Sequence, residues 1–199
     1  MIAVVDYGAG NLKSVVKAFT WIGSSVRVVG NAGELAQADR VVLPGVGAFG
    51  AAMDRLTGSG IRDALYEFLL RGRPFMGICL GMQLLVEGSE ESPGCPGMSL
   101  FPGRCVRFRE GKVPHMGWNR IVSGHEGSSL LRGISRDAWF YFVHSYCLET
   151  LPDPIRPSIV RYHREFVALF EAEHIHAVQF HPEKSGADGL GILRNWVQQ

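Results

Sequence analysis

A cysteine framed by glycines follows an apolar run in the first half of the chain. The run is Pro-Phe-Met at residues 74–76, and Gly-Ile-Cys-Leu-Gly-Met-Gln follows at residues 77–83. This is the spacing of a nucleophile elbow, G-x-S-x-G with Cys79 in place of serine, where small residues allow a sharp turn from a strand into a helix. The N–H groups at the start of that helix favour the thiolate, which is the nucleophilic form. The alternative is an inert buried cysteine behind a glycine-rich turn.

A His-Pro-Glu tripeptide near the other end of the chain supplies the base that a thiol nucleophile needs. Such a nucleophile requires a base within hydrogen-bond reach and a third group that orients the base. Residues 175–180 predict a buried strand, so His181 falls at its carboxyl end, where α/β sheets place their active sites. Glu183 can then accept a hydrogen bond from the second imidazole nitrogen. A surface turn is the alternative for the tripeptide alone, but the two motifs together predict a Cys79–His181–Glu183 triad.

The combined motifs resemble those of the class I (triad) glutamine amidotransferases, which release ammonia from the side-chain amide of glutamine. Further segments resemble the glutaminase subunits of imidazole glycerol phosphate synthases: Asp6–Leu12, Pro44–Gly50, Pro114–Asn119, Tyr141–Tyr146 and His181–Gly186. The resemblance runs from the first strand to the last helix, with residues 93–112 aligning least. It implies a single amidotransferase domain over residues 1–199 with a flavodoxin-like α/β fold.

An oxyanion hole is expected beside the elbow, because acyl transfer needs donors aimed at the tetrahedral oxyanion. Glycines in Pro44-Gly-Val-Gly would let a backbone N–H turn toward that position, and the Leu80 N–H would supply the second donor. The resemblance implies this role for the backbone at Val46 and Gly47. Without the elbow, a plain strand-to-helix turn would be the preferred interpretation.

The resemblance also implies residues that bind the substrate and a partner. Gln83, Glu91 and Ser145 are the implied contacts to glutamine, although a solvated helix residue is an equal interpretation for Gln83 and Glu91. A second set forms the implied partner interface: Asn11, Trp118, Tyr141 and Lys184. Trp118 is expected in a loop bounded by proline and glycine, and core packing is the default alternative for such aromatic side chains.

The implied partner is a (β/α)₈-barrel cyclase subunit that forms a heterodimer with this chain. The barrel would use the ammonia to make imidazole glycerol phosphate and aminoimidazole carboxamide ribotide, a step of histidine biosynthesis. A paralogous glutaminase that feeds a different synthase, such as one of amidino-sugar synthesis, is the nearer alternative. A non-catalytic regulatory binding module on the same fold is the more distant one, and the intact triad argues against it.

The amino-acid composition limits the classes of protein to which the chain can belong. The chain has 199 residues, 46% of them hydrophobic and 20% charged, which suits one well-buried globular domain. A net charge of +1, without a basic cluster interleaved with aromatics, gives no reason to expect nucleic acid. The first residues predict a strand rather than a signal peptide, and no apolar run approaches the roughly 20 residues that span a bilayer.

The cysteines and histidines show no metal-ligand spacing. Cys79, Cys95, Cys105 and Cys147 have no C-x-x-C arrangement, and the histidines have no H-E-x-x-H arrangement. We therefore expect no metal, no cofactor and no disulfide framework. Free thiols and a working cysteine nucleophile fit a reducing cytoplasm.

Alternating strand and helix signals predict how these residues are positioned. Near-continuous apolar runs predict buried parallel strands at residues 2–7, 26–29, 40–43 and 74–79, with helices at 12–21 and 61–71 between them. Strand signals at residues 105–108, 139–146, 158–162, 166–170 and 175–180 predict an antiparallel section, and 190–197 a closing helix. The expected fold is α/β, a mostly parallel central sheet with helices on both faces. Gly-Ala-Gly at residues 8–10 predicts a tight turn, with Asn11 capping the next helix.

Overall fold

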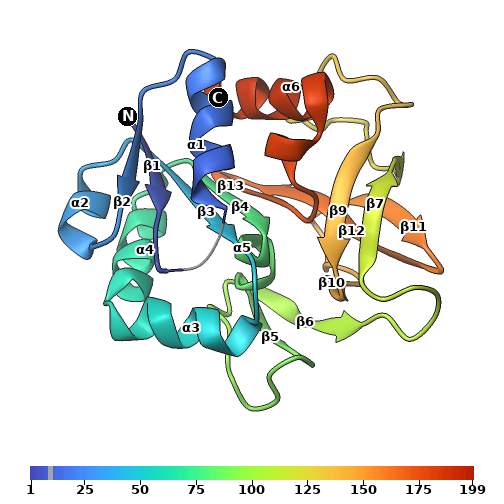
Figure 1. Ribbon diagram of the computed structural model, residues 1–199, viewed down its shortest axis with the longest axis horizontal. Coiled ribbons are helices and arrows are strands. Elements are labelled where there is room, and N and C mark those ends of the chain that lie inside the picture. The colour runs from blue at the N-terminus through green and yellow to red at the C-terminus, as the bar shows by residue number, and fades with distance from the viewer. Residues whose placement is uncertain (9–10) are drawn as a thin grey trace.

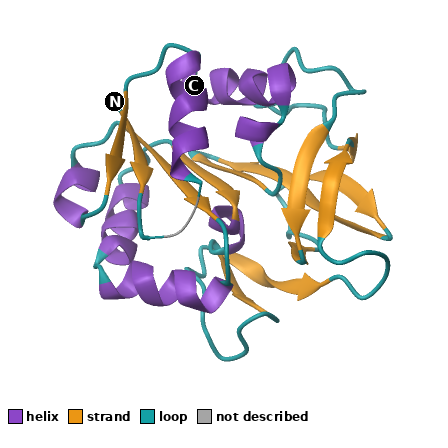
Figure 2. Cartoon of the chain, viewed as in Figure 1, coloured by secondary structure: helices purple, strands orange, loops and turns teal. Residues whose placement is uncertain are grey.

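The main sheet of the computed structural model combines a parallel and an antiparallel part (Figure 2). The structure describes residues 1–8 and 11–199. The sheet runs β2 (Val26–Val29), β1 (Ile2–Val5), β3 (Arg40–Gly45), β4 (Phe75–Cys79), β13 (Ile175–Val178), β12 (Arg164–Ala172), β11 (Ser158–Tyr162), β8 (Ile121–Ser123). Strands β2 to β13 pair in parallel, and β12, β11 and β8 continue the sheet antiparallel. This confirms the predicted sheet with its antiparallel section.

Helices cover both faces of the sheet, as predicted (Figure 1). The side chains of β1 alternate between two cores, because successive residues of a strand point to opposite faces. Ile2 and Val4 pack with α1 (Leu12–Trp21) and α6 (Gly186–Val197), whereas Ala3 and Val5 pack in the core that holds α2 (Ala32–Ala36), α3 (Phe49–Gly58) and α4 (Ile61–Leu70). Sheet and helices together hold the carboxyl ends of β3, β4 and β13 side by side.

Two small sheets lie beside the main one and correct part of the prediction. One is formed by β10 (Tyr146–Leu148), β6 (Phe101–Arg107) and β5 (Val86–Ser89), the other by β7 (His115–Asn119) and β9 (Phe140–His144). The expected strand at 139–146 therefore divides at Ser145, where the chain passes from one small sheet to the other. The expected loop around Trp118 is wrong. Trp118 lies on β7 and pairs with Tyr141, because Pro114 only precedes the strand and an edge strand tolerates a glycine.

The start of α1 differs from the expected cap. Asn11 occupies the N-cap position, but its side chain accepts no hydrogen bond from the helix backbone and instead donates from Nδ2 to Ser14 Oγ over 2.7 Å. The expected cap is therefore wrong. The tight turn expected at residues 8–10 falls partly on residues 9 and 10, which lie outside the described residues.

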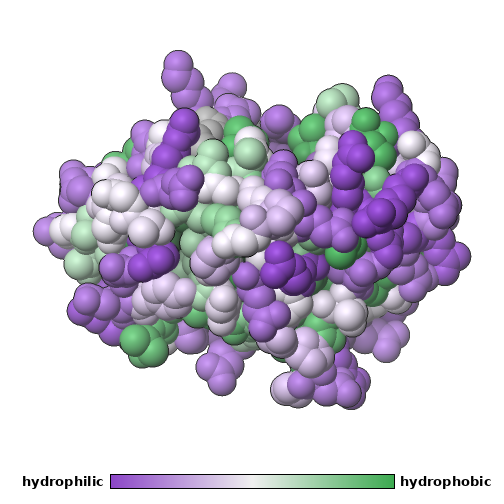
Figure 3. Space-filling model, turned by 90° about the horizontal axis from the view of Figure 1, so that it is seen from below, coloured by the Kyte–Doolittle hydropathy of each residue, from purple (hydrophilic) through white to green (hydrophobic). Residues whose placement is uncertain are grey.

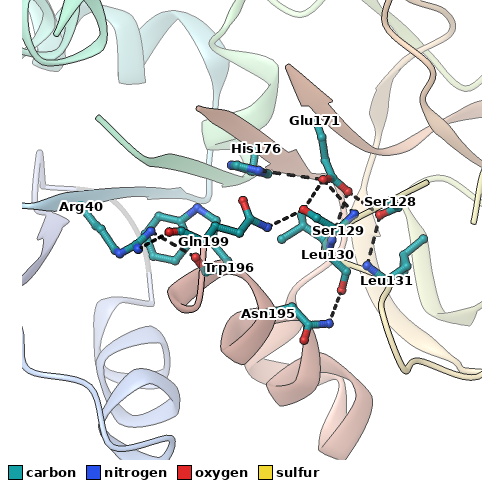
Figure 4. A network of polar contacts seen from close by, with 10 residues as sticks. All are labelled: Arg40, Ser128, Ser129, Leu130, Leu131, Glu171, His176, Asn195, Trp196 and Gln199. Carbon is teal, nitrogen blue, oxygen red and sulfur yellow. Dashed lines mark hydrogen bonds and ion pairs between the residues drawn. The ribbon is translucent and has the colours of Figure 1, made fainter. Parts of the chain in front are cut away.

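A polar network fixes the C-terminal helix to the rest of the chain (Figure 4). The carboxylate of Glu171 on β12 accepts hydrogen bonds from serine hydroxyls and backbone N–H groups at residues 128–130. Gln199 donates to Ser129 Oγ over 2.5 Å, and Asn195 of α6 donates to the carbonyl of Leu130 over 2.8 Å. These polar groups are satisfied by one another, so the network stabilises the fold.

The described residues show no membrane-spanning helix, disulfide or metal-ligand cluster. Each of their helices is too short or too polar to cross a membrane. The cysteines among them are free, and their acidic, histidine and cysteine side chains nowhere gather in a group of three that could hold a metal ion.

Candidate active site

Cys79 lies at the junction of β4 and the short helix α5 (Leu80–Gln83) in a strained backbone conformation. Its φ is 55° and its ψ −108°, where a residue with a Cβ is rarely found. The turn requires glycine nearby, since a Cβ on Gly81 would stand 1.8 Å from the carbonyl oxygen of Leu43 on β3. A Cβ on Gly77 would stand 2.8 Å from the Gly81 carbonyl oxygen. Close packing of β3, β4 and α5 thus fixes the sulfur at the end of β4.

His181 and Glu183 form a buried pair next to the elbow. The 3₁₀ turn η1 (Pro182–Lys184) brings the two side chains together, and His181 Nδ1 donates to Glu183 Oε1 over 2.8 Å. The side chains are 3% and 1% exposed. The backbone N–H of His181 also donates to the Tyr141 carbonyl of β9 over 2.9 Å, which fixes the position of the imidazole. Within the described chain Nε2 has no hydrogen-bond partner of ordinary geometry.

The charges of Cys79 and Glu183 raise the pKa of His181. Burial alone would lower this pKa, but the neighbouring Cys79 and Glu183, the latter hydrogen-bonded to Nδ1, outweigh burial and raise it to about 10. At neutral pH the imidazole therefore carries a proton. A proton donor thus lies beside the cysteine at the elbow.

Cys79 opens onto a pocket of about 310 Å³, large enough for a small polar ligand. The pocket gathers residues from separate elements: Val46, Gly47, Cys79, Leu80, Gln83, Glu91, Pro114, Val143, His144, Ser145 and Tyr146. Every residue expected for the oxyanion hole and for glutamine is among them. A larger pocket of about 440 Å³ lies beside Phe101 and Ile175, and no cysteine is among its described lining residues. Size alone therefore does not select the site.

Hydrogen bonds already made by the pocket residues determine what each can offer a ligand. Gln83 Nε2 donates to the Tyr146 carbonyl over 2.8 Å and to Gln179 Oε1 over 2.9 Å, which leaves Gln83 Oε1 as an acceptor. Glu91 Oε2 accepts from the Phe49 N–H over 2.7 Å at the start of α3. Its other carboxylate oxygen remains for a ligand. The pocket thus presents acceptors suited to an ammonium group.

Three of the four residues expected at a partner interface are exposed, and Tyr141 is half-buried. Trp118 is 53% exposed and packs edge-to-face on Tyr141 with ring centres 5.9 Å apart, and Lys184 Nζ lies 5.7 Å from the Tyr141 ring centre. Asn11 is exposed at the start of α1. Hydropathy alone does not mark an interface, because the face in Figure 3 carries several small separated hydrophobic groups among hydrophilic ones.

Two features of the site were not predicted. Gln179 is fully buried, and its Nε2 donates to Cys79 Sγ over 3.7 Å. It lies within the apolar run at 175–180, where a single glutamine carries no motif. His144 forms a buried hydrogen bond with His115 over 3.2 Å. The two histidines are far apart in sequence, so only the pairing of β7 with β9 reveals their contact.

Comparisons with known proteins agree with this geometry. The family model "Glutamine amidotransferase class-I" matches residues 3–199. A Methanothermobacter thermautotrophicus protein named imidazole glycerol phosphate synthase subunit HisH is 50% identical over 199 residues, covering 100% of this chain and 98% of that protein. The Pyrococcus furiosus protein of the same name is 44% identical over 196 residues, covering 98% and 97%.

Solved structures support the fold. A crystal structure of a glutamine amidotransferase superposes with a TM-score of 0.76 at 16% identity, covering 100% of this chain and 98% of that one. PurLQS from Thermotoga maritima gives 0.74 at 18% identity, covering 99% and 97%. The family match and the full-length identity to HisH proteins lead to one assignment: the chain belongs to the class-I glutamine amidotransferase family, in the group of HisH subunits of imidazole glycerol phosphate synthase.

Proposed function

We propose that residues 1–199 act as one domain that hydrolyses glutamine to glutamate and ammonia through Cys79, His181 and Glu183, as the glutaminase subunit of an imidazole glycerol phosphate synthase. The observation that carries this proposal is the pocket at Cys79. It brings a strained cysteine, an acceptor-rich wall and the expected oxyanion backbone together from β3, α5 and the loops near β5 and β9. The full-length match to HisH proteins supports the substrate.

In the bound state the carboxamide of glutamine faces Cys79 and its α-ammonium group faces the acceptors Gln83 Oε1 and Glu91. Ser145, which also lines the pocket, contacts the amino-acid end of the ligand. Glutamine is small enough for the 310 Å³ available, and the negative charge of Glu91 selects a ligand with an ammonium group. This orientation aligns the amide carbon with the sulfur.

Acylation uses the charges already present in the site. The Cys79 thiolate attacks the carboxamide carbon, and the backbone N–H groups of Leu80 and of the Val46–Gly47 segment stabilise the oxyanion. His181 then gives its proton to the amide nitrogen, so that the C–N bond breaks and ammonia leaves. A glutamyl thioester on Cys79 remains, with His181 neutral.

Deacylation returns the site to its starting state. The neutral imidazole of His181 takes a proton from water, and the resulting hydroxide attacks the thioester carbon. The C–S bond breaks, the new γ-carboxyl group loses its proton to solvent, glutamate leaves, and Cys79 is again a thiolate beside a protonated His181. Throughout, Glu183 holds the proton on Nδ1 and stabilises the imidazolium.

Ammonia is used by a (β/α)₈-barrel cyclase subunit, with which this chain forms a heterodimer. The HisH relatives are named as subunits of a synthase, which supports a partner. The proposed contact surface includes Asn11, Trp118, Tyr141 and Lys184, because the exposed Trp118 packs on the half-buried Tyr141, whose carbonyl holds His181. The barrel then forms imidazole glycerol phosphate and aminoimidazole carboxamide ribotide in histidine biosynthesis. We place the reaction in the cytoplasm, where a cysteine nucleophile stays reduced.

Cys79→Ala in the complex with the cyclase subunit tests this proposal. The variant should lose glutamine-dependent synthesis of imidazole glycerol phosphate but keep ammonia-dependent synthesis, because the two chemistries occupy different subunits. Cys95→Ala is the matched control, since Cys95 is a free cysteine outside the pocket, and it should keep both activities. A glutamine-dependent rate near that of the unaltered complex in Cys79→Ala would remove Cys79 from the nucleophile's role.

Growth tests separate this proposal from a paralogous glutaminase that serves another synthase. The gene should restore growth without histidine to a strain that lacks its own glutaminase subunit but keeps the cyclase. Failure to restore growth, together with glutaminase activity toward another synthase, would favour the paralogue.

A further inference from the structure

Cys79 is a buried residue, 5% exposed, so a thiolate there needs hydrogen-bond donors from the protein. The nearest backbone group recorded for it is the carbonyl of Val143, 3.9 Å away, which is an acceptor and therefore suits the S–H form. The helix that follows, α5, has only four residues, so its dipole is that of a single turn. Among the described residues, Gln179 donates to the sulfur from Nε2 over 3.7 Å.

The orientation of the Gln179 amide follows from the Tyr146 backbone carbonyl, which can only accept a hydrogen bond. Gln83 faces the backbone carbonyl of Tyr146, which only accepts, so the Gln83 atom at 2.8 Å from it is the nitrogen. The same nitrogen also donates to Gln179 over 2.9 Å, so the Gln179 atom on that side is Oε1. The remaining amide atom of Gln179, which faces Cys79, is therefore Nε2, a donor.

Burial keeps this chain of hydrogen bonds in place. Gln179 is fully buried and Gln83 is 5% exposed, so water does not compete for their amides. The Tyr146 carbonyl that starts the chain also accepts from His144 Nδ1 over 2.8 Å, and His144 is itself bonded to His115. A rigid support thus lies behind the amide that faces the nucleophile.

We propose that Gln179 stabilises the Cys79 thiolate through its Nε2–H group, with Gln83 and the Tyr146 carbonyl orienting the amide. The inference rests on the proposed function of Cys79 as the nucleophile. Because an N–H donor favours S⁻ over S–H, Gln179 raises the thiolate fraction at rest. It also favours the thiolate as leaving group when the thioester is hydrolysed, since negative charge then returns to the sulfur. Gln83 accordingly has two roles, one toward the ligand and one toward Gln179.

The rate at which iodoacetamide alkylates Cys79 in the full chain reports the fraction of thiolate, and this measurement does not require glutamine turnover. In Gln179→Met, which keeps the volume and loses the donor, the rate at pH 7 should fall roughly tenfold, as loss of a hydrogen bond to a charged group implies. At pH 10 the two rates should converge, because the thiol then ionises without help. Peptide mass spectrometry separates Cys79 from Cys95, whose rate should not change in the variant.

Phe180→Leu is the control for a packing defect. Phe180 is the fully buried neighbour of Gln179 in sequence and stacks on Phe140 with ring centres 4.4 Å apart, without a hydrogen bond to the sulfur. Its Cys79 alkylation rate should stay within twofold of the unaltered chain. A folded Gln179→Met with an alkylation rate within twofold at pH 7 would overturn the proposal.

A second variant keeps the proposal falsifiable if Gln179→Met does not fold. Gln83→Met leaves Gln179 in place but frees its amide to rotate, so alkylation of Cys79 at pH 7 should fall about threefold, again with convergence at pH 10. An unchanged rate there would overturn the proposal. The proposed function fails separately, if Cys79→Ala keeps glutamine-dependent synthesis.

Discussion

His181 is the residue on which the chemistry of the site depends most. It is held at three atoms: the backbone N–H on Tyr141, Nδ1 on Glu183, and the backbone carbonyl, which accepts from Ser185 Oγ over 2.6 Å. Because these three hydrogen bonds hold the residue, Nε2 is the ring nitrogen that remains free to interact with the sulfur and the substrate. The raised pKa of His181 means that this nitrogen carries the proton that the departing ammonia requires.

Glu183→Gln should reduce glutamine hydrolysis less than His181→Ala. The glutamine side chain keeps the size of the carboxylate but removes the charge that fixes and stabilises the imidazolium. An orienting carboxylate in a related triad is worth about 10⁴-fold and the base about 10⁶-fold, and we expect the same order here. Steady-state turnover of the complex measures both variants. Equal, complete loss in two folded variants would contradict a merely orienting Glu183.

Local motifs indicate the residues of the proposed triad, but they do not indicate the side chains that support it. Cys79 and the His-Pro-Glu motif stand in short local spacings that carry their chemistry with them. Gln179 stands in a run whose other residues are apolar, and its contact with Cys79 exists only because β13 pairs with β4. A side chain that acts only through tertiary contacts cannot be recognised from a local sequence motif.

At the scale of elements, β9 connects the surface to the site. It carries Tyr141, whose carbonyl holds His181, and Val143, whose carbonyl lies 3.9 Å from Cys79 Sγ. Its partner β7 carries the exposed Trp118 on one side and the buried His115 on the other. A shift of this two-stranded sheet would therefore move both proposed catalytic residues.

The buried histidines of β7 and β9 make the fold sensitive to acid. Burial lowers the pKa of His115 from 6.5 to about 4 and that of His144 to about 3. Below pH 6.5 the unfolded chain binds protons that the folded chain does not, so the free energy of unfolding falls as pH drops from about 6.5 toward 4. Each unit of pKa shift is worth roughly 1.4 kcal/mol, so the loss reaches a few kcal/mol.

His115→Phe tests this origin of the acid sensitivity. The phenyl ring can keep the stacking of His115 on Tyr162, whose ring centre is 4.0 Å away, but cannot take up a proton. Urea unfolding at pH 7 and pH 4.5 should show a smaller difference in unfolding free energy for the variant than for the unaltered chain. An identical difference would mean that other groups cause the acid sensitivity.

Elements with strong periodicity were predicted well and those with mixed signals were not. The helix at 12–21 and the strands at 26–29 and 158–162 have the expected bounds. Helix α3 was missed, since Gly50 and Gly58 weaken its signal. Strand β7 was missed because Pro114 and Gly117 suggested a loop, and its pairing with β9 is a tertiary contact.

For the whole molecule, the position of the aromatic surface predicts that glutamine hydrolysis depends on the partner. The purified chain alone should hydrolyse glutamine slowly and accelerate at least 10²-fold when the cyclase subunit and its substrate are bound. The physical reason is that one misplaced oxyanion donor costs about 10²–10³ in rate, and contacts on Trp118 and Tyr141 act directly on β9. Release of glutamate, measured with and without partner and ligand, tests this dependence.

Trp118→Ala distinguishes this coupling from a fixed active site. It should weaken the acceleration by the partner while leaving the slow basal rate of the isolated chain unchanged, since Trp118 is exposed and lies outside the pocket. Full turnover by the isolated chain, unchanged by partner and ligand, would refute the coupling.

The central claim is that Cys79 is the nucleophile toward glutamine, and covalent labelling tests it most directly. A glutamine analogue with a chloromethyl ketone in place of the carboxamide should bind in the pocket of the complex and alkylate the residue that attacks the amide carbon. Peptide mass spectrometry after digestion should find one adduct per chain, on Cys79, with labelling suppressed by excess glutamine and absent in Cys79→Ala. An adduct on another residue, or labelling of Cys79 that glutamine does not suppress, would contradict the account.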